Sequence, residues 1–460
     1  MAAAALILAA GEGTRMKSGL PKVAHRILGV PMVSLVVAAA REAGCDPIVV
    51  VTGHHAEAVE ELLPGETCVR QEKQLGTGHA VMCAESAFAG FDGSLVVLSG
   101  DTPLMRPATI AGLVAAREGS VAAASLLTAR MDDPFGYGRI LRDDNGQIEG
   151  IVEQKDLTDG LGVIDEVNTG TYCFDATALF AHLNRLSDHN VQGEYYLTDI
   201  VGVLRSEGLA VIGVEAESPE ETWGVNTRVH LAAASRVLQR RLNEVHMLAG
   251  VTMTDPELVW VAPTVTLGRD VVLEPMTFLY GDTTVGDGAV VGPSSRVVDS
   301  AVGEGAVIDS SVLRGVRVGA GATVGPMGFL RPGTVLEPRA KTGAFVEVKN
   351  STVGEGSKVP HLSYIGDASI GRDVNIGAGT ITCNYDGAKK HRTVVGDGAF
   401  VGSDTMLVAP VTIGAGAVTG ASSAITKDVP PGALGIERSD MRVVEGWAAR
   451  KRGAAAEGER

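Results

Sequence analysis

Large aromatic side chains, cysteines and long apolar runs are scarce in this sequence, and each scarcity excludes a class of protein. Aromatic residues make up 4% of the 460 residues, whereas glycines number 59. Glycine adopts backbone conformations that other residues avoid, so this pairing favours tightly coiled chain over a core of large side chains. The five cysteines are scattered and form no CxxC pair, so we expect no disulfide framework and a cytoplasmic location. No apolar run reaches about 18 residues, so we expect no transmembrane helix and no membrane partner.

Positive charge is also in deficit. Lys and Arg number 39 against 55 Asp and Glu, which gives a net charge of −16. Phosphate backbones require a basic surface, so we exclude nucleic acid as a generic partner and expect any phosphate site to be a local basic pocket. A hydrophobic content of 45% with 20% charged residues excludes a disordered chain, and the length predicts two or three domains.

The first half of the chain alternates short apolar runs with helical patterns. The runs ALILAA, DPIVVVT and SLVVLSGD are typical of buried parallel strands, and PMVSLVVAAAREAG between the first two predicts a helix. No basic segment precedes the first run, so we interpret it as a strand and not as a signal peptide. The order predicts an open α/β sheet over residues 1–228, with ligands beyond the carboxyl ends of its strands.

Two further segments flank the second half of the chain. Within 229–249, Leu231, Leu238, Leu242, Val245 and Ala249 fall at steps of seven, four, three and four. This spacing predicts a connecting helix with one apolar stripe. Residues 447–460 are small and charged, so we expect them to form a flexible tail.

Between residues 250 and 446 apolar residues recur every six positions. Examples are Val285, Val291 and Val297, then Val312, Val318, Val324 and Leu330, and later Val395, Val401, Leu407 and Ile413. Three such hexapeptides make one triangular coil of a parallel β-helix, with the aliphatic residue pointing inward. We therefore expect a left-handed β-helix domain here. The rhythm breaks near 331–352 and 382–394, where charged residues gather, and insertions that leave a rigid coil are frequent places for function.

The loop Gly11–Arg15, just after the first predicted strand, is a weak motif by itself. It lacks the third glycine of the GxGxxG fingerprint and the GK[ST] of a Walker A loop, and it is equally typical of a structural turn. Arg15 and Lys22 add to it, because backbone N–H groups beside glycines can approach a triphosphate and two cations can offset its charge. Two exposed cations on a solvated loop are the alternative.

Further motifs follow this loop in a fixed order. They are QEKQLGTGHA at 71–80, GDTPL at 100–104, GYGRI at 136–140, IVEQK at 151–155 and VNTG at 167–170. With L-x-x-G-x-G-T-R-M and the Pro-Lys pair at 21–22, the series resembles the sugar-1-phosphate nucleotidyltransferases. With the β-helix added, nearly the whole chain resembles the bacterial family of bifunctional N-acetylglucosamine-1-phosphate uridyltransferases and glucosamine-1-phosphate N-acetyltransferases. The resemblance implies a Rossmann-like mixed sheet in the first domain.

The resemblance implies roles for residues of the first domain. Leu8, Ala9, Ala10, Gly11, Gln71, Gly76, Thr77, Ser99 and Gly100 would surround the uridine nucleotide, with Arg15 and Lys22 acting at its phosphates. Gly138, Glu153 and Asn168 would hold the sugar, and Asp101 and Asn226 would bind Mg²⁺, which prefers oxygen ligands. Ser99 stands where enterobacterial members have Tyr. From the residues alone, Asp101 is also typical of a helix N-cap and Asn226 of a turn.

The β-helix alone does not predict acetyl transfer, because such coils can be structural or regulatory. Arg331 and Lys349 suit a phosphate, and a neutral His361 could accept a proton from an amine that attacks a thioester. The resemblance implies that His361 is the general base, that Arg331, Lys349, Tyr364, Asn375 and Lys390 bind glucosamine-1-phosphate, and that Ala378, Asn384, Tyr385, Ser403, Ala421 and Arg438 bind acetyl-CoA. Surface roles for His361 and Lys390, and a plain turn at 384–387, are the alternatives.

The sequence thus predicts a bifunctional enzyme. It would acetylate glucosamine-1-phosphate with acetyl-CoA and couple the product to UTP, giving pyrophosphate and UDP-N-acetylglucosamine, a precursor of cell-wall polymers. The resemblance also implies a homotrimer. One alternative is a nucleotidyltransferase with a regulatory β-helix, against which His361, Arg331 and Lys349 argue. Another is a non-catalytic assembly subunit, in which the glycine loop and Asp101 would typically be degraded.

Overall fold

The computed structural model describes residues 2–158 and 160–458, and the chain divides into two compact units, Met1–Leu242 and Asn243–Arg460. Each unit has hydrophobic clusters of its own. The division falls within helix α7 (Arg228–Leu248). The predicted domain limits at 228, 249 and 446 stay predictions.

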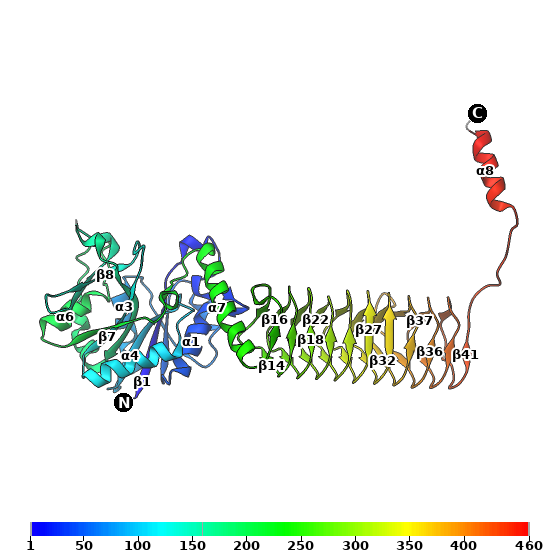
Figure 1. Ribbon diagram of the computed structural model, residues 1–460, viewed down its shortest axis with the longest axis horizontal. Helices are drawn as coiled ribbons and strands as arrows, with labels where there is room; N and C mark the ends of the chain where they lie inside the picture. Colours follow the sequence, from blue (N-terminus) through cyan, green and yellow to red (C-terminus); the bar gives the residue numbers. More distant parts are fainter. Residues whose placement is uncertain (1, 159, 459–460) are drawn as a thin grey trace. The chain divides into compact units, whose positions relative to one another are not determined.

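Unit 1 is built on a mixed sheet of nine strands in the order β11-β7-β10-β6-β1-β4-β5, with β8 pairing β10 and β9 (Figure 1). The strands are β1 (Ala3–Ala9), β4 (Ile48–Thr52), β5 (Thr67–Arg70), β6 (Ser94–Ser99), β7 (Ala124–Arg130), β8 (Gly138–Arg142), β9 (Ile148–Val152), β10 (Glu166–Asp175) and β11 (Val211–Glu215), and β2 (Arg26–Ile27) and β3 (Val30–Pro31) form a separate hairpin. Since β10 runs antiparallel to β6 and β7, the sheet is mixed, as the resemblance implies.

Helices cover both faces of this sheet. They are α1 (Met32–Glu42), α2 (Ala56–Glu60), α3 (Thr77–Ala84), α4 (Pro107–Ser120), α5 (Ala176–His182) and α6 (Asp199–Ser206). Side chains alternate along β1, so Leu6 joins a cluster with α3, α5 and α6, whereas Ile7 joins a second cluster with α1 and α4. The predicted strands and the first predicted helix are confirmed. Gly11 and Asp101 follow the carboxyl ends of the neighbouring strands β1 and β6.

Unit 2 is a left-handed parallel β-helix with three walls, each a ladder of short strands (Figure 1). The first wall contains β12 (Thr252–Met253), β15 (Val272–Leu273), β18 (Val290–Val291), β21 (Val307–Ile308), β24 (Thr323–Val324), β27 (Lys341–Ala344), β30 (Lys358–His361), β33 (Asn375–Ile376), β36 (Phe400–Val401), β39 (Val418–Thr419) and β41 (Leu434–Gly435). The second contains β13 (Trp260–Val261), β16 (Phe278–Tyr280), β19 (Arg296–Val298), β22 (Val312–Arg314), β25 (Phe329–Leu330), β28 (Glu347–Lys349), β31 (Tyr364–Gly366), β34 (Ile381–Cys383), β37 (Met406–Val408) and β40 (Ala424–Ile425). The third contains β14 (Thr266–Leu267), β17 (Thr284–Val285), β20 (Ala301–Val302), β23 (Arg317–Val318), β26 (Val335–Leu336), β29 (Thr352–Val353), β32 (Ala368–Ile370), β35 (Thr393–Val395) and β38 (Val411–Ile413).

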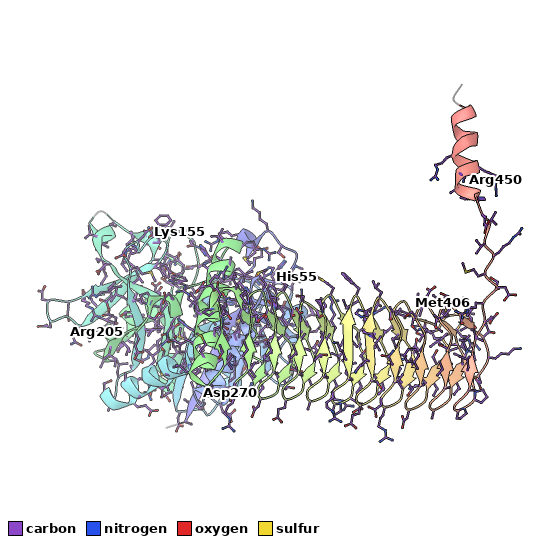
Figure 2. All side chains as sticks on the ribbon, turned by 45° about the vertical axis from the view of Figure 1, so that its right-hand side comes forward. His55, Lys155, Arg205, Asp270, Met406 and Arg450 are labelled. Atoms are coloured by element: carbon purple, nitrogen blue, oxygen red, sulfur yellow. The ribbon has the colours of Figure 1, made fainter. Side chains whose placement is uncertain are left out.

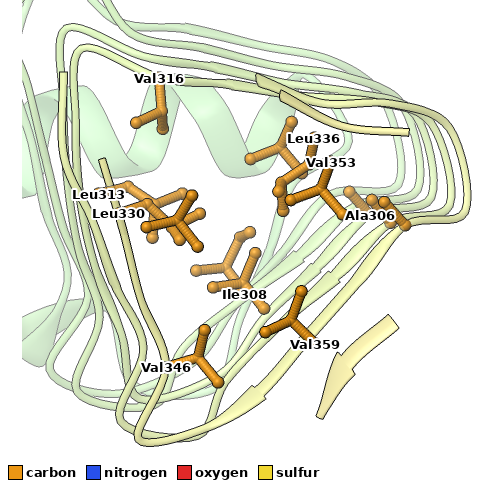
Figure 3. Close-up of a cluster of buried hydrophobic side chains, with 14 of the residues drawn as sticks. Ala306, Ile308, Leu313, Val316, Leu330, Leu336, Val346, Val353 and Val359 are labelled. Atoms are coloured by element: carbon orange, nitrogen blue, oxygen red, sulfur yellow. The ribbon is translucent and has the colours of Figure 1, made fainter. Parts of the chain in front are cut away.

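The interior of the coil holds one inward side chain from each hexapeptide. Figure 3 shows Ile308, Leu313, Leu336 and Val353 pointing between the walls, and all four are nearly or fully buried. Outside the walls, side chains project into solvent, from Asp270 near the start of the coil to Met406 farther along (Figure 2). The predicted six-residue rhythm is confirmed, with aliphatic residues supplying most of the core.

Two details of the rhythm differ from the prediction. The inward residue of β22 is Leu313, and Val312 is only half-buried, because some turns are one residue shorter than a full hexapeptide. The predicted break at 331–352 is wrong. Thr342 takes the inward position six residues after Leu336, and it is fully buried, so the coil continues without an insertion.

The second predicted break is a true insertion. Thr352 pairs with Ser369 on the next coil, whereas Ala368 pairs with Thr393, so the later coil is longer. The extra residues form a loop in which Tyr385 and Lys390 make a β-bridge. This loop follows β34 and carries several of the residues that the sequence singles out.

The predicted apolar stripe of the connecting helix does not match the buried face of α7. Ala234, Val237, Gln239 and Asn243 are buried, whereas Val245 is 62% exposed. Asn243 is buried because its Nδ2 donates hydrogen bonds to the carbonyls of Pro256 and Val259, at 2.8 and 2.9 Å. Residues 447–460, the predicted flexible tail, include helix α8 (Trp447–Gly458), and the flexibility itself stays a prediction.

Candidate active sites

The glycine loop of unit 1 packs directly against Lys22. Gly13 has a φ of 67°, in the left-handed region, and a Cβ added there would lie 2.5 Å from Lys22 Cβ. A side chain at position 13 would therefore push away the short 3₁₀ helix Lys22–Ala24. Glycine is therefore needed at position 13, because only a residue without a side chain lets the loop pack this closely against Lys22.

Four polar side chains meet beside this loop. Lys22 forms an ion pair with Asp101, and its Nζ lies 3.1 Å from Asn226 Oδ1, which also accepts from Arg15 Nη2 at 2.9 Å. The backbone N–H of Val225 donates to the carbonyl of Asp101 at 2.9 Å. This bond holds the segment that carries Asn226 next to Asp101. The helix that follows Asp101 begins at Pro107 with Arg106 at its N-cap, so the N-cap alternative for Asp101 is wrong.

A cavity of about 420 Å³ opens next to this cluster. Its lining includes ten of the predicted residues, namely Leu8, Ala9, Ala10, Gly11, Lys22, Gln71, Gly76, Thr77, Ser99 and Asp101. Arg15, Gly100, Gly138, Glu153, Asn168 and Asn226 are not part of this lining. The size is that of a small-molecule pocket, and its wall combines backbone of the glycine loop with one cation, Lys22, and the carboxylates of Glu12, Asp101 and Glu194.

The three residues predicted to hold the sugar come together where β8, β9 and β10 lie side by side. Gly138 pairs with Asn168 between β8 and β10, and a Cβ on Gly138 would lie 3.5 Å from Glu153 Oε2. Thr198 Oγ1 donates to Glu153 Oε1 at 3.2 Å. Burial raises the pKa of Glu153, the Thr198 hydrogen bond opposes the rise, and the charges of Asp199 and Asp156 add to it.

The sequence reasoning missed several residues of this site. Glu12, Gln74 and Glu194 line the cavity, and Tyr195 packs against its glycines. A Cβ on Gly76, whose φ is 107°, would lie 2.5 Å from the carbonyl oxygen of Tyr195. Glu194 and Tyr195 lie more than a hundred positions from the glycine loop, and no local motif marks them. Tyr137 belongs to the quoted motif GYGRI, although the sequence did not assign it a role. Burial is the larger cause that raises the pKa of Tyr137, and the charge of Asp101 adds to it.

In unit 2, a second polar centre lies where the second wall turns into the third. Asp367, just after β31, accepts hydrogen bonds from Asn350 Nδ2 and Asn384 Nδ2, both at 2.6 Å. Burial raises the pKa of Asp367, but these hydrogen bonds and the nearby charges of Lys349 and Lys390 outweigh it and lower the pKa. Its carboxylate is therefore charged, and it holds three successive coils together.

Two lysines meet beside Asp367. The neighbouring ammonium group of Lys349 lowers the pKa of Lys390, because two positive charges at close range repel each other. Tyr364 lies on the same side, because a Cβ on Gly366 would clash with its hydroxyl and lie 2.7 Å from Asn384 Nδ2. Arg331, one coil earlier, forms an ion pair with Glu347 at 2.9 Å. Adjacent cations beside an open corner suit a dianionic phosphate.

His361 lies at another corner, between the first and second walls. It is exposed at the end of β30, and its carbonyl accepts from Ser363 Oγ at 2.7 Å and from Gly379 N–H at 3.3 Å. The same corner continues through successive coils, since Asp404 N–H donates to Ala378 O and Ser422 N–H to Ser403 O. Four of the predicted acetyl-CoA residues gather along it: Ala378, Ser403, Ala421 and Arg438, whose Nη1 donates to Ala421 O at 3.4 Å.

The remaining predicted residues of unit 2 lie elsewhere. Tyr385 is 61% exposed in the inserted loop, where its hydroxyl donates to Gly387 O at 2.6 Å. Asn375 begins β33, where it pairs with Lys358 and Phe400 in the first wall. Within the described residues, no hydrogen bond or ion pair joins His361 or Asn375 to the Lys349–Lys390 pair. One chain therefore places the predicted base and the predicted phosphate ligands at different corners.

Comparisons with known proteins cover both units. A family model described as a MobA-like NTP transferase domain matches residues 5–167. The proteins named "Bifunctional protein GlmU" from Heliobacterium modesticaldum and Streptomyces avermitilis are 50% and 49% identical, over 97% and 98% of this chain and 98% and 95% of their own lengths. The chain belongs to the family of bifunctional GlmU proteins. The GlmU protein of Mycobacterium bovis is 48% identical over 98% of this chain and 92% of its own length.

Membership of the GlmU family confirms the prediction of a bifunctional transferase. The protein transfers both uridylyl groups and acetyl groups. The relatives span the β-helix as fully as the α/β unit, which favours this reading over a nucleotidyltransferase with a merely regulatory coil. A solved structure titled as UDP-glucose pyrophosphorylase complexed with UDP-glucose covers 52% of this chain and 100% of its own at 18% identity and a TM-score of 0.43, too distant to bear on function. Among the helices of the described chain, none has the length and apolarity that a membrane crossing requires.

Proposed function

We propose that the two units catalyse successive steps, acetylation of glucosamine-1-phosphate in unit 2 and uridylyl transfer to the product in unit 1. The observation that carries this assignment is the presence of one polar centre in each unit. Lys22, Asp101 and Asn226 converge beside a cavity in unit 1, and Lys349 and Lys390 meet beside Asp367 in unit 2.

In unit 2, Arg331, Lys349 and Lys390 bind the phosphate of glucosamine-1-phosphate, with Tyr364 and Asn375 as further ligands. His361 accepts a proton from the sugar amine as its nitrogen forms a bond to the acetyl carbonyl carbon. The carbon–sulfur bond of acetyl-CoA then breaks, and the thiol leaves with one proton. The corner formed by Ala378, Ser403, Ala421 and Arg438, with Asn384 and Tyr385 of the inserted loop, holds the coenzyme.

In unit 1, the residues Leu8 to Gly11, Gln71, Gly76, Thr77, Ser99 and Gly100 surround the uridine nucleotide. Gly138, Glu153 and Asn168 hold the N-acetylglucosamine. An oxygen of the sugar phosphate attacks the α-phosphorus of UTP, and the bond to pyrophosphate breaks. Lys22 and Arg15 offset the negative charge that develops on the phosphates. The chain thus acts by positioning its substrates and neutralising their charge.

Asp101 and Asn226 fit the Mg²⁺ ion that this chemistry implies. Their Oδ2 and Oδ1 atoms converge on one cation, the ammonium group of Lys22, and oxygen is the donor that Mg²⁺ prefers. No group of three His, Cys, Asp or Glu among the described residues could hold a metal, so substrate phosphates and water would complete the coordination. When bound, Mg²⁺ supplies positive charge at the phosphates of UTP.

The arrangement of unit 2 supports a homotrimer. The corner with His361 and the corner with Lys349 and Lys390 lie at opposite ends of the second wall, roughly 15–20 Å apart for a wall of one hexapeptide. An amine and a phosphate of one small sugar cannot span that distance, so a neighbouring copy would supply one of the two corners. UTP and acetyl-CoA as co-substrates support a cytoplasmic location.

Two variants test the assignment of one reaction to each unit. Asp101→Ala is expected to abolish pyrophosphate release and to leave acetyl transfer at the wild-type rate. His361→Ala is expected to abolish acetyl transfer, followed as release of the free CoA thiol, and to leave pyrophosphate release unchanged. If either substitution removed both activities in a protein with an unchanged melting temperature, the assignment of separate chemistry to the two units would be wrong.

A further inference from the structure

The Gln71 side chain occupies a fixed place in the wall of the unit 1 cavity. It follows β5 directly, its backbone N–H donates to Thr52 O at 2.8 Å, and only 3% of the residue is exposed. Its neighbours in the lining include Gly76 and Thr77. A buried amide has two different ends, an NH₂ donor and a carbonyl acceptor, and which end faces the cavity decides what it can recognise.

Two neighbours determine the orientation of this amide. Gln71 Nε2 lies 3.1 Å from the carbonyl oxygen of Gly76 and 3.0 Å from His79 Nδ1. A backbone carbonyl only accepts, so the end that faces Gly76 must be the NH₂ group. Its second hydrogen then goes to His79 Nδ1, which must carry a lone pair. The proton of a neutral His79 is therefore on Nε2.

Both neighbours are themselves held in place. The carbonyl of Tyr195 accepts from Gly78 N–H, and the N–H of Tyr195 donates to Leu75 O, both at 2.8 Å. These two bonds fix the backbone segment that contains Gly76. His79 projects from the first turn of α3, and Cys83 Sγ lies 3.8 and 3.9 Å from its two ring nitrogens, one helical turn later. The Gln71 amide thus cannot rotate without losing two hydrogen bonds.

The consequence is that Gln71 presents an acceptor. With Nε2 occupied twice, Oε1 accepts no hydrogen bond from the residues that the structure describes. Uracil carries an N3–H donor between two carbonyls, whereas cytosine has a lone pair at N3 and an amine at position 4. An acceptor at this place binds uracil N3–H and opposes the cytosine N3 lone pair.

We infer that His79 sets the base specificity of unit 1, by accepting from Gln71 Nε2 and so holding Oε1 toward the nucleotide. The inference rests on the proposed function, since it takes the cavity as the place of the UTP base. His79 is a positioning residue, because it acts through Gln71. Without the Nδ1 acceptor, only the Gly76 carbonyl opposes rotation of the amide, and an amide turned by half a rotation would offer its NH₂ group to cytosine N3.

The test compares UTP with CTP in uridylyl and cytidylyl transfer by the full-length protein. His79→Phe keeps a ring of similar size and removes the acceptor, and we expect the ratio of kcat/KM for UTP to that for CTP to fall about ten-fold or more. The loss should appear mainly in KM for UTP. His79→Asn places an amide oxygen where Nδ1 was, so it should restore the wild-type ratio. His79→Leu gives the same comparison if the phenylalanine variant does not fold.

Three results would overturn the inference. The first is an unchanged UTP to CTP ratio in His79→Phe, including the case in which both nucleotides lose activity equally. The second is a His79→Asn variant that loses selectivity as fully as His79→Phe. The third is a wild-type protein that uses both nucleotides equally well. A wild-type protein with no uridylyl transfer at all would instead contradict the proposed function, so the two failures are distinguishable.

Discussion

At the scale of single residues, Asp367 is where three coils of unit 2 meet. It receives hydrogen bonds from Asn350 and Asn384, and its charge lies near Lys349 and Lys390. We predict that Asp367→Ala lowers acetyl transfer about ten-fold or more, because Asn384 loses its anchor and the two lysines lose a counter-charge. The rate of CoA release measures the effect. Uridylyl transfer of the same variant is the control, and its loss would point to a general folding defect.

The carboxylate of Asp367 also makes the stability of unit 2 depend on pH. The folded state lowers the pKa of Asp367 below its ordinary value of 3.8, so its contribution to stability is present above that pH and is lost as the pH falls through the folded-state pKa. The wild-type protein should therefore lose more stability than Asp367→Asn when the pH is lowered from 5 to 2. Denaturation curves of unit 2 at the two pH values test this expectation. Equal losses in both proteins would contradict it.

Glu153 presents the opposite case. Burial raises its pKa above the ordinary value of 4.5, so the folded state binds the proton more tightly than the unfolded chain. Stability therefore falls as the pH rises from about 4.5 through the folded-state pKa, and the full cost is present above it. Glu153→Gln, which still accepts from Thr198, should raise the melting temperature at pH 8 and leave it nearly unchanged at pH 4. It should also raise KM for N-acetylglucosamine-1-phosphate, and a variant with neither effect would exclude a buried charge here.

At the scale of elements, the corners of the coil leave no room for a side chain at certain glycines. A Cβ on Gly343 in β27 would clash with the carbonyl oxygen of Pro360 on the next coil, directly before His361. We predict that Gly343→Ala destabilises unit 2 by about 1–3 kcal/mol and slows acetyl transfer. Gly112→Ala in α4 is a matched control, since nothing lies within 4 Å of its added Cβ. That change should stabilise unit 1 by about 0.5–1 kcal/mol, and a loss in both variants would contradict the argument.

The same elements show how far sequence reasoning reaches. Strands of unit 1 and most coils of unit 2 follow from local patterns, because each buries a periodic set of apolar residues. The continuation of the coil through 331–352 could not be predicted from the sequence, because Thr342 fills an inward position where the pattern expects an aliphatic residue. The buried face of α7 was missed because Gln239 and Asn243 are polar. Their burial is compatible with the hydrogen bonds they make, since Gln239 accepts from Arg236 and Asn243 donates to two backbone carbonyls.

The candidate site of unit 1 was predictable where motifs carry it. Ten predicted residues line the cavity, and they come from segments with quoted motifs. Glu194 and Tyr195 could not be found in this way, since their segment reaches the cavity through tertiary contacts with Gly76 and Gly78. The orientation of the Gln71 amide was equally invisible, because it depends on which atoms of Gly76 and His79 face it.

At the scale of the whole molecule, the two units differ in how they can complete a site. Unit 1 brings its cation, carboxylate and amide together within one chain, beside one cavity. Unit 2 repeats along one axis, so residues at a given position of each coil stack at one corner, and different corners stay apart along the entire coil. Extending the coil cannot bring His361 toward Lys349, whereas packing two coils side by side can.

Mixed oligomers test this difference directly. Chains with His361→Ala lack the proposed base, and chains with Lys349→Ala lack one phosphate ligand, so each variant alone should have little acetyl transfer. If each site takes its two corners from two copies, co-expression in equal amounts leaves about one quarter of the sites with both residues intact. Acetyl transfer of the purified mixture should then approach about a quarter of the wild-type rate. If both corners of a site came from one chain, no assembly of these two variants could contain an intact site, and the mixture would stay as inactive as its parts.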